Sequence, residues 1–416
     1  MSCAISSASG AFSDASLLAL PARFGHPLWV YDAAVIRRQI ARLRQFDVIR
    51  FAQKACSNTQ ILRLMREQGV KVDAVSLGEI ERALVAGYQA QDIVFTADVI
   101  DDATLARVAE LGIAVNAGSI DMLDQLGAVS PGHEVWLRIN PGFGHGHSQK
   151  TNTGGENSKH GIWFAELHLA LAAVKRHRLR LIGLHMHIGS GVDYGHLERV
   201  CGAMVEQTIA AGEDIQAISA GGGLSVPYRD GEREINAGHY YGLWNAAREK
   251  IALHLGHPVM LEIEPGRFLV AEAGALLTQV RSVKRMGSRH FALADAGFND
   301  LMRPAMYGSY HPISALAGDG RALENGRPQD YVVAGPLCES GDVFTQQEGG
   351  TVETRRLPEL HPGDYLVIHN TGAYGASMSS NYNSRPLLAE VLLDNGEARL
   401  IRRRQTIQDL LALEEV

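Results

Sequence analysis

The sequence predicts an α/β fold, in which a (β/α)8 TIM-like barrel is followed by a mostly β C-terminal domain. Between about residues 48 and 266, short runs of β character alternate with amphipathic stretches of helical period. After about residue 278 the pattern changes to short strands separated by Gly, Pro and Asp turns. An open doubly wound sheet stays possible for the first region, because alternation shows the number of strands better than their closure.

Eight strands are expected in the barrel region, which is the number that closes a TIM barrel. They lie near residues 48–55, 71–76, 92–97, 113–117, 134–140, 180–188, 216–221 and 259–264. Helices with one apolar side are expected between the strands, for example from Thr59 to Gly69 and from Gly78 to Gly87. Both examples end on glycine, as helix C-termini prefer.

Three parts are expected along the chain. Residues 33–277 form the barrel, and residues 278–416 form the β domain. Residues 1–32 are assigned to the β domain, because the strand-like run from Pro27 to Asp32 is not needed for the barrel count. Further strands of the β domain are expected at residues 330–334, 363–369 and 397–402.

The composition excludes several classes of protein. A chain of 416 residues with 46% hydrophobic residues can bury one or two large cores. A formal net charge of −7 without a long basic run argues against a nucleic-acid partner. No apolar run approaches the ~18 residues of a membrane span, so we expect a cytoplasmic protein without a membrane partner. Four cysteines without CxxC pairing favour free thiols over a disulfide frame or a zinc site.

Side chains capable of chemistry stand at the predicted C-terminal ends of several barrel strands. They are Lys54, Asp73, His187, Glu264 and the glycines 221–223. Because the C-terminal ends of barrel strands share one mouth, we expect these groups to converge. A lysine at the end of a buried strand is either a paired structural cation or a reactive amine, and Lys54 alone does not separate the two.

Two glycine turns follow the sixth and seventh predicted strands. Residues 185–191 read His-Met-His-Ile-Gly-Ser-Gly, and residues 220–225 read Ala-Gly-Gly-Gly-Leu-Ser. Glycine lets the backbone approach an anion, and phosphate sites of barrels often follow the late strands. His185 and His187 could also be a packed pair or half of a metal site, but the chain offers no convincing further ligands, so no metal is predicted.

Four further segments carry polar groups that are ambiguous alone. Glu264 and Arg267 in Glu-Pro-Gly-Arg could form a salt-bridged strand end, or serve a pyridine nitrogen and an anion. In the β domain, residues 338–342 read Cys-Glu-Ser-Gly-Asp, although a lone cysteine is more often buried filler than an acid. The other two segments offer the phenol of Tyr374 in Gly-Ala-Tyr-Gly, and Arg303 followed by Tyr307.

Together these residues resemble the barrel-type pyridoxal-phosphate-dependent decarboxylases, and within them the diaminopimelate decarboxylase family. The resemblance covers nearly the whole chain, in family order. Its specific motifs are the stretch around Lys54, His-Ile-Gly-Ser-Gly, Gly-Gly-Gly-Leu, Glu-Pro-Gly-Arg, Cys-Glu-Ser-Gly-Asp and Gly-Ala-Tyr-Gly. One departure is the polar loop 142–161, which is fuller than in many relatives, and its role as a lid or a structural loop stays open.

The resemblance implies decarboxylation of meso-2,6-diaminopimelate to L-lysine and CO2, the last step of lysine biosynthesis. It implies that Lys54 binds pyridoxal 5'-phosphate covalently and that Cys338 protonates the product. The expected cofactor residues are Lys54, Asp73, His187, Ser190, Gly223, Glu264, Gly266, Arg267 and Tyr374. The expected substrate residues are Arg267, Arg303, Tyr307, Glu339 and Tyr374. In this family Cys338 and its neighbours serve the partner subunit, so a homodimer with shared active sites is implied.

Other functions stay open. A decarboxylase of the same fold could act on ornithine, arginine or carboxynorspermidine, although two arginines near the pocket suit the distal carboxylate of diaminopimelate, with Glu339 on the distal ammonium. An alanine-racemase-like activity is disfavoured, because Glu264 would keep the ring nitrogen charged. A non-catalytic relative that binds the cofactor is disfavoured by the presence of both Lys54 and Cys338.

Overall fold

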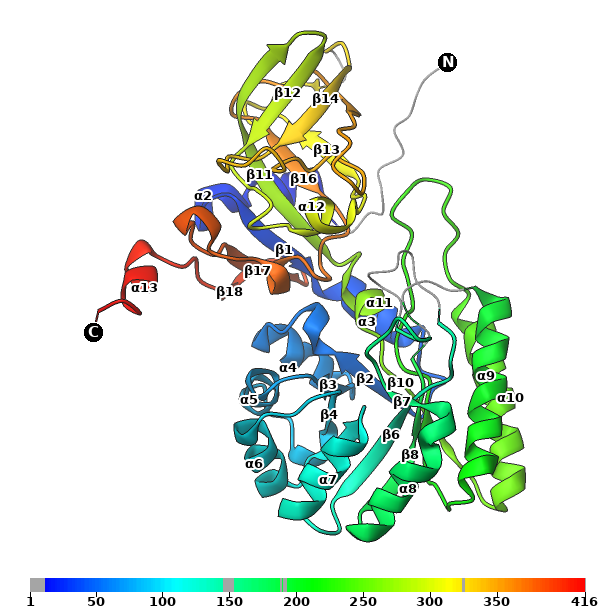
Figure 1. The fold of residues 1–416 in the computed structure, drawn as a ribbon. Helices are drawn as coiled ribbons and strands as arrows, with labels where there is room; N and C mark the ends of the chain where they lie inside the picture. Colours follow the sequence, from blue (N-terminus) through cyan, green and yellow to red (C-terminus); the bar gives the residue numbers. More distant parts are fainter. Residues whose placement is uncertain (1–11, 145–152, 188, 190–192, 324–325, 416) are drawn as a thin grey trace. The chain divides into compact units, whose positions relative to one another are not determined.

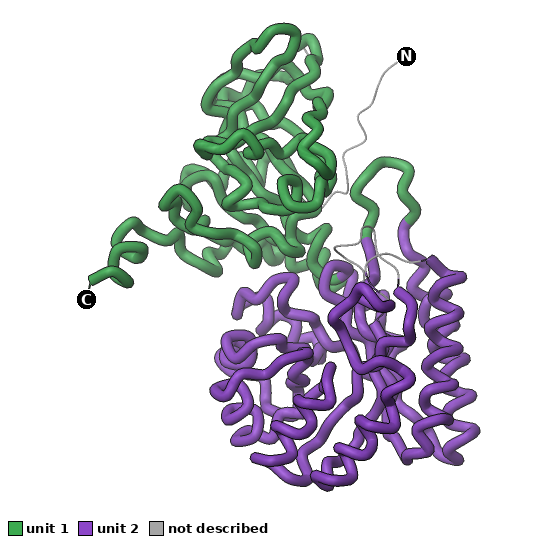
Figure 2. Tube along the Cα trace, in the orientation of Figure 1, with its two compact units in different colours: residues 1–38, 226–233, 269–416 green, residues 39–225, 234–268 purple. Residues whose placement is uncertain are grey.

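The computed structural model describes residues 12–144, 153–187, 189, 193–323 and 326–415, which fall into two compact units (Figure 2). Unit 1 comprises residues 1–38, 226–233 and 269–416. Unit 2 comprises residues 39–225 and 234–268. Residues 226–233, which follow the second glycine turn, group with unit 1, although they lie within the expected barrel range. The three-part division expected from the sequence stays a prediction.

Unit 2 contains a closed barrel of eight parallel strands (Figure 1). The strands are β2 (Val48–Ala52), β3 (Lys71–Ala74), β4 (Ile93–Ala97), β5 (Ala114–Ala117), β6 (Glu134–Asn140), β8 (Arg180–His185), β9 (Ala217–Ser219) and β10 (Met260–Ile263). Each pairs with the next, and β10 pairs with β2, which closes the ring. A short strand, β7 (Ile162–Trp163), is added beside β6. The predicted barrel is confirmed, and the open sheet is excluded.

The first and last barrel strands are joined by a buried ion pair as well as by backbone pairing. Arg50 on β2 donates from Nε to Oε2 of Glu262 at 2.6 Å and from Nη2 to Oε1 at 3.2 Å. Only 6% of Arg50 and 3% of Glu262 are exposed. Such a two-bond arrangement fixes the geometry of a guanidinium and a carboxylate. The pair therefore ties together the two strands at which the barrel closes.

Helices connect the barrel strands, as their apolar spacing predicts (Figure 1). They are α4 (Thr59–Glu67), α5 (Leu77–Val85), α6 (Asp102–Leu111), α7 (Ile120–Val129), α8 (Leu167–Arg176), α9 (Tyr194–Ala211) and α10 (Ala237–Leu255). Asn58 and Ser76 cap α4 and α5 by accepting from the backbone N–H groups of Gln60 and Glu79. Gly69 and Gly87, with φ of +71° and +93°, follow the ends of these two helices.

Unit 1 is built on a mixed sheet of nine strands in the order β15-β14-β12-β11-β1-β17-β18, with β16 pairing both β11 and β13. The strands are β1 (Leu28–Asp32), β11 (Gly274–Met286), β12 (Arg289–Ala294), β13 (Ile313–Leu316), β14 (Gln329–Ala334), β15 (Arg355–Leu357), β16 (Tyr365–Ile368), β17 (Ala389–Asp394) and β18 (Glu397–Arg402). The mostly β C-terminal domain is confirmed.

The core of unit 1 collects residues from both ends of the chain. The early strand β1 pairs antiparallel with β11, where Trp29 lies opposite Leu276, and parallel with β17. Leu28, Leu277 and Val391 are fully buried in one apolar cluster. The short helices of this unit are α1 (Asp14–Leu18), α2 (Leu20–Phe24), α12 (Arg303–Tyr307) and α13 (Ile407–Leu411). Two helices, α3 (Ala33–Ala41) and α11 (Arg267–Val270), run across the unit boundaries. Among the described residues, none of the helices has the length and apolar character of a membrane span.

Candidate active site

The carboxylate of Glu264 is held by two side chains at the C-terminal ends of neighbouring strands. Glu264 directly follows β10, His185 ends β8, and Ser219 ends β9. Nε2 of His185 lies 2.9 Å from Oε2 of Glu264, and the Ser219 hydroxyl donates to Oε1 at 3.0 Å. All three residues are buried. The barrel mouth thus holds one carboxylate with a partner on each oxygen.

These partners keep Glu264 ionised in spite of its burial. Desolvation alone would raise the pKa of a buried carboxyl. The charge and hydrogen bond of His185, the hydroxyl of Ser219 and the charge of Arg50 outweigh that effect and lower the pKa of Glu264 to about 2. A buried, permanently negative group at this position suits a cationic partner such as a protonated ring nitrogen.

Asp73 stands in the opposite protonation state. It lies on β3 with 3% of its surface exposed. Burial, and next the charge of Glu264, raise the pKa of Asp73 to about 8, while Lys54 and a hydrogen bond with Thr96 act in the other direction. Asp73 is therefore mostly protonated at neutral pH, so the site holds one negative and one neutral carboxyl group.

Lys54 lies in the short 3-10 helix Gln53–Ala55 that directly follows β2, and its side chain is exposed. Its charge acts on the pKa of Asp73, of Glu79 and of His187. The ammonium group therefore lies near Asp73 on β3, Glu79 on α5 and His187 after β8. The structure brings Lys54, Asp73, His187 and Glu264 into one electrostatic neighbourhood.

His187 presents a neutral ring with a defined tautomer. Burial, then the charges of Arg138 and Lys54, lower its pKa well below the ordinary value. The backbone N–H of Gly222 donates to Nδ1 at 2.8 Å, so the ring proton is on Nε2. A neutral imidazole fixed in this way can stack on a flat cofactor ring without adding charge to it.

The glycine turn after β9 approaches His187 and Glu264 more closely than another residue could. A Cβ on Gly222 would lie 2.6 Å from the carbonyl oxygen of Glu264 and 3.2 Å from Cε1 of His187. Gly221 and Gly223 have φ of +59° and +101°, which favours glycine. The N–H groups of Gly221 and Gly222 donate to the Ser219 hydroxyl at 3.2 Å and to Nδ1 of His187 at 2.8 Å, so the N–H of Gly223 is the one in this turn that suits a phosphate.

The remaining predicted cofactor residues of unit 2 lie at the end of β10 and in the turn after β8. Gly266 packs against Ala52 and Ala55, where a Cβ would meet the Ala52 oxygen and the Ala55 methyl at 3.2 Å. Arg267 begins α11 and is partly exposed. Ser190 lies outside the described residues, as do residues 145–152 of the polar loop.

The described ends of the polar loop are tied to the barrel. The Asn140 amide donates to the carbonyl oxygens of Gly155 and His160, each at 3.2 Å, and accepts from the N–H of Gly155 at 2.9 Å. Nδ1 of His160 lies 2.6 Å from Oδ2 of Asp98. The N–H of Gly142 also donates to Oδ1 of Asn140 at 3.1 Å, so both ends of the loop are held beside β6, and its role stays open.

Sequence reasoning missed three polar residues of the mouth. His185 was treated as part of a histidine pair, Ser219 was not singled out, and Arg138 was read only as part of a strand. Arg138 is 8% exposed on β6, and its charge lowers the pKa of both Asp98 and His187. A cation inside an otherwise apolar strand was the available signal for Arg138.

In unit 1 the structure brings Arg303 and Tyr374 together. The guanidinium carbon of Arg303 lies 5.6 Å from the ring centroid of Tyr228 and 6.0 Å from that of Tyr374. Nε of Arg303 is 3.3 Å from Nε2 of His311, and Nη2 donates to the Ser309 hydroxyl at 3.2 Å. Tyr307 lies at the end of the same short helix, α12.

Cys338 and Glu339 lie in an exposed turn after β14. The N–H of Cys338 donates to Oδ1 of Asn383 at 3.0 Å, and the N–H of Asp342 donates to the Glu339 carbonyl oxygen at 3.1 Å. Within the turn, Oδ2 of Asp342 accepts from the N–H of Leu337 at 2.7 Å. A thiol displayed on the surface of a braced turn does not act as buried filler. It is accessible from outside the unit.

The donor set of unit 2 fits pyridoxal phosphate. Lys54 offers an amine for an aldehyde, Glu264 an ionised carboxylate for a ring nitrogen, and His187 a neutral ring for stacking. In the tight turn after β9, the backbone N–H of Gly223 suits a phosphate, while those of Gly221 and Gly222 hold Ser219 and His187. Within the described ranges, no three His, Cys, Asp or Glu side chains are grouped as metal ligands.

Comparisons with known proteins agree with this geometry. Residues 32–271 match the family model described as "Pyridoxal-dependent decarboxylase, pyridoxal binding domain". The chain is 78% identical over 403 residues to diaminopimelate decarboxylase of Escherichia coli K12, covering 96% of each chain.

Two solved structures are similar over nearly the whole chain. A crystal structure of diaminopimelate decarboxylase superimposes with a TM-score of 0.94 at 78% identity, covering 96% of each chain. The Helicobacter pylori enzyme complexed with L-lysine gives a TM-score of 0.83 at 32% identity, covering 95% of this chain and 98% of the other. The chain therefore belongs to the diaminopimelate decarboxylase family of pyridoxal-dependent decarboxylases.

Proposed function

We propose that this chain decarboxylates meso-2,6-diaminopimelate to L-lysine and CO2, with pyridoxal 5'-phosphate as cofactor. The observation that carries the proposal is the buried Glu264 carboxylate, bound by His185 at 2.9 Å and Ser219 at 3.0 Å at the mouth of a barrel. The proposal is also supported by the two relatives that are 78% identical to this chain over 96% of their length, since both are named diaminopimelate decarboxylase. The activity is the last step of lysine biosynthesis.

When bound, pyridoxal phosphate supplies a ring that accepts the electron pair left on the α-carbon as CO2 departs. Lys54 would supply the amine that holds the cofactor aldehyde. Glu264, which stays ionised, holds a proton on the pyridine nitrogen. His187, which stays neutral, covers the ring face, and the protonated carboxyl of Asp73 avoids a second negative charge beside it.

Further residues are assigned to the cofactor phosphate by the resemblance and by their chemistry. Hydroxyl, guanidinium and backbone N–H groups bind phosphate oxygens well. The proposed phosphate residues are Ser190, Gly223, Gly266, Arg267 and Tyr374. The tight packing of the turn at Gly222 supports this role for its neighbour Gly223, because the backbone there has no Cβ that would hold an anion away.

The proposed substrate carries an ammonium and a carboxylate at each end, so its site needs both cationic and anionic side chains. Arg303 is the proposed partner of the distal carboxylate, as the family resemblance implies, because a guanidinium binds a carboxylate with two parallel bonds. Glu339 is proposed to pair with the distal ammonium. Arg267, Tyr307 and Tyr374 complete the proposed substrate residues. Ornithine and arginine lack the distal carboxylate that Arg303 would hold, so the rival decarboxylases are not favoured.

Cys338 is proposed to donate the proton that replaces CO2 on the α-carbon. Its thiol is exposed on a turn whose backbone is fixed by Asn383. An exposed acid on one copy can reach into the site of a second copy, as the family resemblance implies. We therefore propose a homodimer with shared active sites. A cytoplasmic location stays a prediction of the sequence.

The test is CO2 release from purified protein loaded with cofactor, across meso-diaminopimelate, L-ornithine, L-arginine and carboxynorspermidine. We expect kcat/KM for diaminopimelate to exceed the others by at least about a hundredfold, because Arg303 is proposed to bind the distal carboxylate that distinguishes diaminopimelate. Equal turnover of ornithine or arginine would overturn the substrate assignment. Borohydride fixation and peptide mapping should place the pyridoxyl group on Lys54, and a tag on another lysine would overturn its role.

A further inference from the structure

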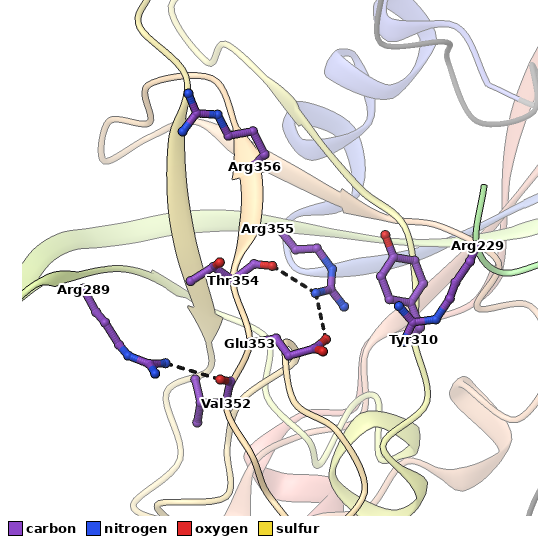
Figure 3. A pocket seen from close by; sticks show the side chains of 8 residues that line it. All are labelled: Arg229, Arg289, Tyr310, Val352, Glu353, Thr354, Arg355 and Arg356. Carbon is purple, nitrogen blue, oxygen red and sulfur yellow. Dashed lines mark hydrogen bonds and ion pairs between the residues drawn. The ribbon is translucent and has the colours of Figure 1, made fainter. Parts of the chain in front are cut away.

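Unit 1 contains a pocket of about 560 Å³ whose lining is rich in arginine (Figure 3). It is lined by Arg229, Arg289, Tyr310, Val352, Glu353, Thr354, Arg355 and Arg356. These residues come from four separate parts of the chain: the segment 226–233, the start of β12, the loop before β13, and residues 352–356, which run into β15. We call the site formed by Arg229, Arg289, Arg355 and Arg356 the arginine pocket.

Two of the arginines are held together by one aromatic ring. The guanidinium carbons of Arg229 and Arg355 each lie 4.1 Å from the ring centroid of Tyr310, so they cannot be further apart than twice that distance (Figure 3). Each packs well on the electron-rich ring. Two like charges at this separation nevertheless repel each other, so an anion between or beside them would lower the electrostatic energy.

The acidic groups near the pocket do not balance its cations. Glu353 is the one carboxylate that lines it, and it accepts from Nη1 of Arg355 at 3.3 Å. Arg356 pairs with Asp330 at 3.2 Å, while Arg289 donates to the carbonyl oxygen of Val352 at 3.3 Å. Four guanidinium groups thus face two carboxylates, which leaves an excess of positive charge.

Arg355 also has bonding capacity left over. Its side chain is 12% exposed, and its buried Nε has no hydrogen-bond partner among the described residues. A buried donor without an acceptor is costly, and an oxyanion is the partner that a guanidinium prefers. The ring of Tyr310 already packs against two cations, so the pocket offers charge and hydrogen-bond donors rather than a surface for stacking.

We propose that the arginine pocket binds a small multivalent oxyanion, one that carries two or more phosphate or carboxylate groups. A volume of about 560 Å³ accommodates more than a single such group. Phosphate and carboxylate each present two oxygens that a guanidinium can bind with two parallel bonds. The site is separate in sequence from the residues assigned to cofactor and substrate.

The arginine pocket is joined to Arg303 through adjacent residues. Arg229 follows Tyr228 in the chain, and Tyr310 precedes His311. The rings of Tyr228 and His311 pack edge to face at 5.4 Å. Arg303 packs on the Tyr228 ring and hydrogen-bonds His311. An anion that moves Arg229 or Tyr310 therefore acts on Tyr228 and His311, which are two of the residues that contact Arg303. This coupling rests on the proposed function, because there Arg303 binds the substrate.

Binding is tested by calorimetry on the cofactor-loaded full chain, at constant ionic strength, with pyrophosphate and with citrate as probes. We expect at least one probe to bind, and its identity distinguishes phosphate from carboxylate. Arg229→Gln and, separately, Arg355→Gln should each weaken binding about tenfold or more, since each removes a charged hydrogen-bond donor. Arg281→Gln is the matched control, because it removes one charge from an exposed position on β11 of the same unit.

Absence of binding by both probes would overturn the proposal. Equal binding by wild type and Arg229→Gln would overturn it too, and so would an equal loss in Arg281→Gln, which would indicate nonspecific attraction. Arg229 is exposed, so this variant is expected to fold even where Arg355→Gln does not.

Coupling is tested by the KM for meso-diaminopimelate with and without the probe that binds. We expect a KM change of threefold or more in wild type and in Arg281→Gln, with little change in kcat, and no change in Arg229→Gln. An unaltered KM in wild type would overturn the coupling. Calorimetric binding without any CO2 release would instead contradict the proposed function, so the two failures are distinguishable.

Discussion

Nε2 of His185 and Oε2 of Glu264 lie 2.9 Å apart, although 79 positions of sequence separate the two residues. Both are at the C-terminal ends of barrel strands, on β8 and directly after β10. This contact, with the Ser219 hydroxyl on the other oxygen, makes a buried carboxyl a permanent anion. The first test of the site therefore concerns the charge of Glu264.

Glu264→Ala should slow kcat by at least about a hundredfold, because the ring nitrogen would lose the group that holds its proton. Cofactor affinity should change little, because the phosphate contacts and Lys54 stay in place. Turnover of CO2 measures the first effect, and absorbance during cofactor titration measures the second. Ser219→Ala, which removes one hydrogen bond to the carboxylate but keeps its charge, should cost much less. Unchanged kcat in Glu264→Ala would contradict the role.

The raised pKa of Asp73 predicts that the stability of the apoprotein depends on pH. The folded state keeps the Asp73 proton up to about pH 8, whereas an unfolded aspartate loses it near 3.8. The native state therefore binds more protons in this window, and the free energy of unfolding from this group falls as pH rises, by up to about 1.4 kcal/mol per pH unit.

Asp73→Asn should remove that slope, because its side chain stays neutral. Urea unfolding between pH 5 and 8 measures the free energy, with exposed Asp121→Asn as the control, which should keep the slope of wild type. A wild-type slope in Asp73→Asn would show that other groups cause it.

Glu262→Leu should destabilise the barrel by about 3–5 kcal/mol, because it leaves the Arg50 guanidinium buried and unpaired. The double change Arg50→Met with Glu262→Leu should recover most of this loss, since it removes both charges. Chemical denaturation measures the free energy of unfolding. Lys175→Ala breaks an exposed pair with Glu213 in the same unit and should cost less than about 1 kcal/mol. A similar loss of unfolding free energy in Glu262→Leu and Lys175→Ala would contradict the role of burial.

Arg303→Ala should raise the KM for meso-diaminopimelate by about tenfold or more, since a charged hydrogen bond to the distal carboxylate would be lost. The dissociation constant of pyridoxal phosphate should stay within about twofold of wild type, a change near the noise of ordinary surface variants. An equal loss of both affinities would place Arg303 with the cofactor instead. Steady-state kinetics and cofactor titration give the two values.

Mixing inactive variants tests the proposed shared site. Lys54→Ala and Cys338→Ala should each be nearly inactive alone. If Cys338 serves the partner's site, dimers with one copy of each variant contain one intact site, and random mixing should restore about a quarter of wild-type activity. Refolding or subunit exchange followed by CO2 assay measures the recovery. A mixture as inactive as its components would contradict the exchange of residues between copies.

The fold was largely predictable because each barrel strand has a recognisable local sequence pattern. Runs of buried β residues at regular spacing gave all eight strands within a few residues of their observed bounds, as for the strand expected at 134–140 and found as Glu134–Asn140. Glycine after each of two early helices marked their ends correctly. Closure was not visible in the periodicity, since it depends on β10 pairing with β2 across more than two hundred residues.

The site was predictable where chemistry follows directly from position on one strand. Lys54, Asp73, His187 and Glu264 each occur at a strand end, and strand ends share the mouth. The partners of these groups were not predictable, because they depend on register. His185 binds Glu264, rather than forming a pair with His187, only because β8, β9 and β10 end at matching levels.

The β domain shows the limit of local patterns. Nothing in the sequence around residue 228 indicated a tyrosine beside Arg303, or that residues 226–233 group with the C-terminal strands. The arginine pocket was missed for the same reason, since its arginines are drawn from three distant segments. Exposure of Cys338 was also unexpected for an isolated cysteine, which is usually buried.

The ion pair between Arg50 and Glu262 has a consequence for synthesis of the chain. A ribosome makes the strand before Lys54 long before it makes the strand that ends at Ile263. Until then the barrel cannot close between β2 and β10, and the Arg50 guanidinium lacks its partner Glu262. The pair, and with it the closed barrel, can therefore form only after nearly two thirds of the polypeptide has been translated.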